Sequence, residues 1–73
     1  MAVVKESLDF DAARIKLLRI RLGETQAEFA KRCGVNQNTI NSWETGAHKP
    51  QFVHGLNGLL EAERELARRL LRD

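Results

Sequence analysis

Residues 25–46, TQAEFAKRCGVNQNTINSWETG, constrain the fold of this chain most strongly. Thr25 and Glu28 are spaced as a capping box, in which each side chain accepts a hydrogen bond from the backbone amide of the other residue. Residues 26–33 then follow a helical pattern. Gly34 suits the left-handed conformation in which many helices end, because glycine has no Cβ atom to clash there. The pattern therefore predicts a short helix that ends in a tight turn.

A second short helix is expected over residues 37–45. Asn36 can cap its N-terminus, and Val35 and Ile40 are placed as a hydrophobic staple around that cap. Gly46 ends the pattern, as glycine often does after a helix. Together the two helices and their turn form the central unit of the chain.

The outer face of this second helix carries four amide and hydroxyl side chains, Gln37, Asn38, Asn41 and Ser42. Asn and Gln can make two hydrogen bonds to adenine in the major groove of DNA, and Ser can bond to any base. A solvated helix face more often carries Glu and Lys. On these residues alone, a base-reading face and an inert polar face both remain open as interpretations.

The segment resembles the helix-turn-helix of the Cro/C1-type, or XRE, family of phage-repressor-like proteins, through the pattern TQAEFA-x₃-GV-x₃-TI-x₂-WE-x-G. The resemblance includes Ala30, the turn Gly34, Ile40 and the Glu44-x-Gly46 ending. It covers roughly residues 10–60, with Ile15, Leu18 and Arg19 on one side and Pro50 on the other. Glu24 departs from the pattern, because the family usually has an apolar residue there.

The resemblance implies an all-α fold: a compact, lambda-repressor-like DNA-binding domain of four to five helices. It also implies site residues, carried over position by position. The base-reading residues would be Gln37, Asn38, Asn41 and Ser42. The phosphate-binding residues would be Gln26, Thr45, Lys49, and Arg14 or Lys16. A structural salt bridge would join Arg19 to Glu44 and so tie the first helix to the recognition helix.

The charge distribution agrees with a polyanionic partner. Residues 14–50 carry seven basic and three acidic groups, whereas residues 1–13 sum to −2 and residues 51–73 to zero. A positive field over the helix-turn-helix favours double-stranded DNA as the partner.

The flanking segments are less constrained. Residues 1–8 fit a loose or disordered arm, an extended arm, or a strand that pairs across a dimer, and a loose arm is the default. A first helix is expected from about Asp9, as its N-cap, to Leu22. Its buried stripe would be Ile15, Leu18 and Leu22, and Trp43 of the recognition helix is expected to fill the core beside it.

After Pro50, the side chains of Phe52, Val53 and Leu56 are expected to pack on the core, which completes a helix-turn-helix domain over residues 9–60. Residues 61–73 form an amphipathic helix. Gly58 leaves open whether one long helix or two shorter ones span this region. The apolar stripe exceeds what a small core can bury, so Leu59, Leu66, Leu70 and Leu71 are expected to form a homodimer interface. The alternative is that the helix folds back and buries the stripe within one chain.

Several classes of function are excluded. The single cysteine, Cys33, cannot form an internal disulfide, and it fits a small buried hydrophobe better than a redox sensor. His48 and His54 lack neighbours of metal-ligand spacing, so neither metal nor cofactor is expected. No catalytic constellation is present, so an enzyme is not expected. The chain has neither an apolar run long enough to span a membrane nor a signal peptide, and we expect a cytoplasmic protein.

The sequence therefore predicts a transcriptional regulator, most simply a repressor that binds an inverted-repeat operator as a homodimer. Two alternatives remain. One is the antitoxin of a toxin–antitoxin pair, which would use the same DNA-binding unit and also hold a toxin. The other is a protein-interaction module that has lost DNA binding. A contact with RNA polymerase would be needed for activation, and the sequence does not separate activation from repression.

Overall fold

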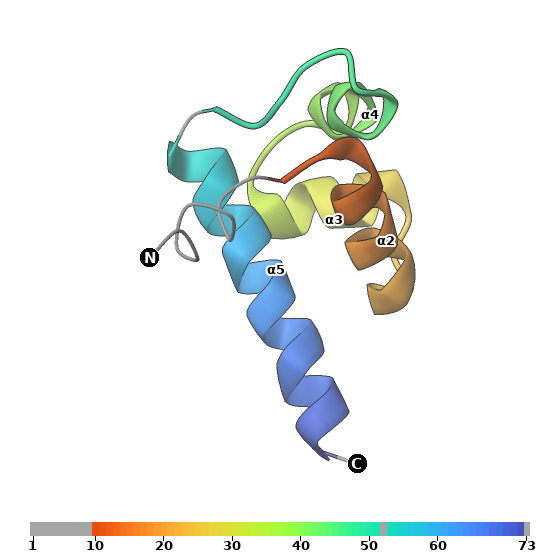
Figure 1. Ribbon diagram of the computed structural model, residues 1–73, viewed down its shortest axis with the longest axis vertical. Helices are drawn as coiled ribbons and strands as arrows, with labels where there is room; N and C mark the ends of the chain where they lie inside the picture. Colours follow the sequence, from red (N-terminus) through yellow and green to blue (C-terminus); the bar gives the residue numbers. More distant parts are fainter. Residues whose placement is uncertain (1–9, 52, 73) are drawn as a thin grey trace.

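The computed structural model describes residues 10–51 and 53–72. Four α-helices make up the ordered secondary structure of these residues: α2 (Ala12–Leu22), α3 (Gln26–Cys33), α4 (Gln37–Thr45) and α5 (Val53–Arg72) (Figure 1). The described residues contain no strand. The predicted all-α class is therefore confirmed. The expected arm over residues 1–8, together with Asp9 and Phe52, falls outside the described residues.

The starting points of α2 and α3 follow from their capping residues. The capping box of α3 is present, with Thr25 Oγ1 accepting from the Glu28 amide at 3.1 Å and Glu28 Oε1 accepting from the Thr25 amide at 2.8 Å. Asp11 caps α2 by accepting from the Arg14 amide at 2.8 Å. The predicted start near Asp9 is therefore wrong, because the side chain that satisfies the first free amides is that of Asp11.

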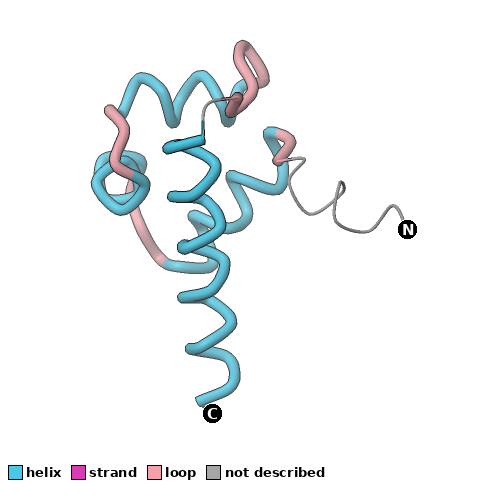
Figure 2. The backbone as a smooth tube through the Cα atoms, turned by 90° about the vertical axis from the view of Figure 1, so that its left-hand side faces the viewer, coloured by secondary structure: helices cyan, strands magenta, loops and turns pink. Residues whose placement is uncertain are grey.

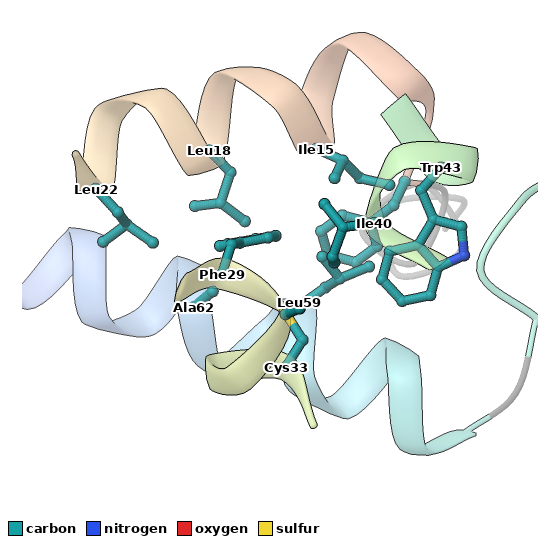
Figure 3. Packing of buried hydrophobic residues seen from close by; sticks show 11 residues of the cluster. Ile15, Leu18, Leu22, Phe29, Cys33, Ile40, Trp43, Leu59 and Ala62 are labelled. Carbon is teal, nitrogen blue, oxygen red and sulfur yellow. The ribbon is translucent and has the colours of Figure 1, made fainter. Parts of the chain in front are cut away.

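One hydrophobic core joins all four helices (Figure 3). Phe29 of α3, Ile15 of α2 and Ile40 of α4 are fully buried, and Trp43 is buried beside them as predicted. Burying a side chain of this size stabilises the fold by about 1.5–3 kcal/mol. The remaining buried apolar residues are Phe10, Leu18, Leu22, Ala30, Cys33, Leu59 and Ala62.

Helix α5 is one continuous helix of 20 residues, so Gly58 does not divide it. It packs across α2 and α3, and its last turns project beyond the other helices (Figures 1 and 2). Leu59 is fully buried in the core, so its expected place in a dimer interface is wrong. Leu56 is partly buried against the core as expected, whereas Val53 is 72% exposed and does not pack there.

Candidate nucleic-acid interface

The turn between α3 and α4 is fixed by the backbone and by one side chain. Gly34 adopts a φ of 75°, and its amide and that of Val35 donate to the last carbonyls of α3. Asn36 Oδ1 then accepts from the Thr39 amide at 2.9 Å and from the Thr39 hydroxyl at 3.0 Å. These bonds fix the angle at which α4 leaves α3, so the predicted helix-turn-helix over residues 25–46 is present.

The two faces of α4 differ sharply. Its inner face inserts Ile40 and Trp43 into the core (Figure 3). On its outer face Gln37, Asn38 and Asn41 are exposed, while Ser42 is half-buried. Three of the predicted base-reading side chains are therefore open to a ligand. Ser42 is more enclosed, and its carbonyl oxygen accepts from the His48 amide at 3.3 Å and from the Thr45 hydroxyl at 3.2 Å.

The predicted salt bridge between α2 and α4 is present. Arg19 Nε donates to Glu44 Oε2 at 2.6 Å, and Arg19 Nη2 donates to Glu44 Oε1 at 3.1 Å, which makes a two-bond pair. The side chains are only 16% and 5% exposed, respectively. Arg19 Nη1 also donates to the Glu24 carbonyl at 3.0 Å. One guanidinium thus holds the end of the recognition helix and the loop before α3 in fixed positions.

Gln26, predicted as a phosphate contact, also has a structural role that the sequence did not reveal. Its Nε2 donates to Glu44 Oε1 at 3.2 Å and lies 3.5 Å from Asn41 Oδ1. Burial would raise the pKa of Glu44, but the hydrogen bonds from Arg19 and Gln26 outweigh it, and the pKa lies below its ordinary value. Gln26 therefore joins the start of α3 to α4, next to an expected base-reading side chain.

The predicted phosphate-binding residues near this surface divide into two groups. Lys16, Thr45 and Lys49 are exposed, and the charge of Lys16 contributes to the lowered pKa of Glu44 at the end of α4. Arg14, by contrast, is held against α5. Its Nε and Nη2 donate to the Glu63 carboxylate, each at 2.9 Å, and its guanidinium lies 4.0 Å from the centre of the Phe10 ring. Of the alternatives Arg14 and Lys16, the structure leaves Lys16 available for a phosphate.

Two further contacts support the turn and were not predicted. Glu24 forms an ion pair with Arg32 of α3. The hydrogen bonds that Arg32 donates to the Glu24 carboxylate are the main reason that its pKa is lowered. This partner explains how a carboxylate replaces the apolar residue that the family usually has there. His54 of α5 places Nε2 2.9 Å from the carbonyl oxygen of Gly34. Neither partner could be identified from spacing, because both contacts join separate elements.

The described residues hold no group of three or more His, Cys, Asp or Glu side chains that could bind an ion. Within the same part of the chain, no helix is long and apolar enough to cross a membrane. What the surface offers is an exposed amide-rich helix beside exposed cations.

A capped helix, a glycine turn and a second helix with an exposed polar face define a helix-turn-helix domain. A family model described as Helix-turn-helix matches residues 15–52, just over half of the chain. The chain therefore belongs to the helix-turn-helix family of the Cro/C1 type, a family of DNA-binding transcription regulators rather than enzymes. Comparisons with curated proteins and with solved structures give no significant match.

Proposed function

We propose that this protein is a sequence-specific transcriptional repressor that occupies an inverted-repeat operator as a homodimer. The observation that carries the proposal is the exposed amide face of α4, formed by Gln37, Asn38 and Asn41, on a helix anchored by core residues. Such side chains can read base edges in the major groove.

The rigid support of α4 favours specific rather than loose binding. Ile40 and Trp43 anchor α4 in the core. Near the C-terminal end of α4, the Glu44 carboxylate accepts hydrogen bonds from both Arg19 and Gln26. A side chain reads a base well only if its backbone cannot shift away. Because Gln26 also lies against Asn41, it would fix the orientation of an amide that faces the DNA.

Contacts with the phosphate backbone would come from residues around α4. The exposed Thr45 and Lys49 follow the recognition helix, and Lys16 lies close to its end. The N-terminus of α3, with Gln26, would present the positive end of the helix dipole to a phosphate. Such contacts position the protein without reading sequence. In a homodimer, two copies of α4 would lie roughly 34 Å apart, one turn of the duplex.

The deciding experiment is selection from a pool of random duplex DNA, with the bound sequences read out. Enrichment of an inverted repeat would support a dimeric, sequence-specific regulator, and reporter transcription from a promoter carrying that repeat would give the sign of regulation. Binding without enrichment would contradict base reading by α4. Absence of binding even at low salt would instead favour the alternative of a protein-interaction module that has lost DNA binding.

A further inference from the structure

The imidazole of His54, in the first turn of α5, lies against the turn of the helix-turn-helix. Its Nε2 atom is 2.9 Å from the carbonyl oxygen of Gly34. A carbonyl oxygen can only accept a hydrogen bond, so Nε2 carries the hydrogen and donates it. The ring also covers the glycine, because a Cβ atom at Gly34 would lie 2.5 Å from Nε2 and 3.1 Å from Cε1. The contact is therefore both a hydrogen bond and a close packing of the ring on the backbone.

The position of His54 follows from how closely α5 approaches α3. Gly58, one helical turn further along α5, packs directly on the backbone of Cys33. Residues four apart lie on the same face of a helix. The face of α5 that meets Cys33 therefore also presents His54 to Gly34, the next residue of the chain. Leu59, fully buried in the core, anchors the same part of α5.

The hydrogen bond acts on one particular peptide group, the one that joins Gly34 to Val35. The amide of this group, on Val35, donates to the Ala30 carbonyl of α3 at 3.0 Å. Its carbonyl oxygen, on Gly34, accepts from His54 of α5. Because a peptide group is planar, hydrogen bonds at both of its ends restrict its rotation. Within the described part of the chain, no backbone amide outside the helices donates to this carbonyl, so the imidazole is what holds that end.

This peptide group lies where a change in backbone conformation would be easiest. Gly34 has a φ of 75°, and glycine has access to more backbone conformations than other residues. Only Val35 and Asn36 separate it from Gln37, the first residue of α4 and part of the proposed base-reading face. A rotation at Gly34 would therefore move the start of α4. Hydrogen bonds to bases depend on distance and angle, so such a movement would weaken them.

We infer that His54 is a positioning residue for base reading. It acts through the Gly34 carbonyl to fix the orientation of α4, and so raises the affinity for the operator relative to other DNA. The inference rests on the proposed function, since it concerns how the amide face of α4 is held against the bases. A different role for an exposed histidine is a direct contact with a phosphate, which would raise the affinity for every sequence alike.

The first test compares two substitutions of His54. Alanine removes the donor, whereas the side-chain amide nitrogen of glutamine can still donate. Affinities for the selected operator and for an unrelated duplex of equal length are measured by fluorescence anisotropy over a range of salt concentrations. His54→Ala should weaken operator binding by roughly two- to tenfold, as the net contribution of one hydrogen bond implies. It should leave binding to the unrelated duplex and the salt dependence unchanged, and His54→Gln should retain most of the operator affinity.

Val53→Ala is the matched control, because Val53 precedes His54 in the same helical turn and is 72% exposed. It should leave both affinities unchanged, and thermal melting verifies that each variant is folded. Equal losses on every sequence, together with a less steep salt dependence, would overturn the inference in favour of a phosphate contact. Equal losses of operator affinity from His54→Ala and His54→Gln would also overturn it.

A second measurement follows the turn without DNA. Hydrogen exchange of the Val35 amide, measured by NMR, should be faster in His54→Ala than in the unmodified chain, while amides in the middle of α2 should exchange at unchanged rates. An unchanged rate at Val35 would overturn the inference.

The two measurements separate the inference from the proposed function. If the unmodified chain binds no DNA, the proposed function fails, whereas faster exchange at Val35 in His54→Ala would still support His54 as the residue that holds the turn. If the unmodified chain selects an operator and His54→Ala keeps the same preference for it, the inference fails and the proposed function stands.

Discussion

Helix α5 crosses α3 so closely at Gly58 that a Cβ atom there would lie 2.6 Å from the carbonyl oxygen of Cys33. The same Cβ would lie 2.8 Å from the Cys33 Cα atom, so the obstacle is backbone that cannot rotate away. Glycine is therefore required by packing in the middle of a helix, where it costs up to ~1 kcal/mol relative to alanine.

We expect Gly58→Ala to lower the free energy of unfolding by about 1–3 kcal/mol, because overpacking outweighs the gain in helix propensity. Urea unfolding would measure the change. Asn57→Ala is the matched control, because Asn57 is the exposed neighbour in the same helix and should be neutral or slightly stabilising. A Gly58→Ala variant as stable as the unmodified chain would show that α3 and α5 can separate without cost.

Glu44→Ala should destabilise the domain strongly. It leaves the mostly buried Arg19 guanidinium without its carboxylate and removes the acceptor of Gln26. Breaking such a pair costs about 3–5 kcal/mol, which corresponds to a fall in melting temperature of at least about 10 °C in a domain of this size. Glu61→Ala, which removes an exposed pair with Arg64, should change stability by less than about 1 kcal/mol. An unchanged melting curve for Glu44→Ala would contradict the structural role of the bridge.

The same carboxylate should make stability depend on acid. The pKa of Glu44 in the folded state lies below its ordinary value of 4.5. A carboxyl group whose pKa is lower in the folded state than in the unfolded state stabilises the fold at pH values above its unfolded-state pKa. That stabilisation is lost as the pH falls through the folded-state pKa. The difference in unfolding free energy between the unmodified chain and Glu44→Gln should therefore shrink below about pH 4.5. Denaturant titrations at a series of pH values would measure it, and a constant difference would disprove the assignment.

Cys33 should be chemically inert while the domain is folded. The side chain is buried in the core, and burial raises the pKa of its thiol to about 11 despite the opposing charge of Arg32. Because the thiolate is the reactive form, a disulfide-exchange reagent at about pH 8 should label the protein only in denaturant. Rapid labelling of the folded domain would instead favour the redox-sensor interpretation.

Base-reading and phosphate-binding residues should give different defects in DNA binding. Asn38→Ala should cost ~1–3 kcal/mol on the selected operator and relax the preference at one base pair. Lys49→Ala should weaken binding to every sequence and make the dependence on salt less steep. Titrations against the operator, single-base variants and unrelated DNA would separate the two. Equal losses on all sequences from both variants would contradict base reading by α4.

Local chemistry was sufficient to predict the central motif. The capping box at Thr25, the cap at Asn36 and the glycines at 34 and 46 depend on neighbours a few residues away, and the structure shows all of them. The start of α2 differs from the prediction because Asp9 and Asp11 are both typical N-cap residues. Only the position of the first helical turn decides that Asp11 caps the helix. The Arg19–Glu44 pair was expected from family resemblance alone, since their spacing by itself indicates no contact.

The sequence by itself thus determined the helices, their caps and the amide face of α4, because these follow from short-range periodicity and hydrogen bonding. Only the tertiary structure decided which apolar side chains are buried in the core and which remain exposed. Leu59 and Leu70 belong to the same stripe of α5, yet one is buried in the core and the other is 69% exposed. The difference arises because the end of α5 extends past α2 and α3, which no longer cover its apolar stripe there. The position at which this cover ends depends on how the helices cross, and no residue of the stripe indicates it.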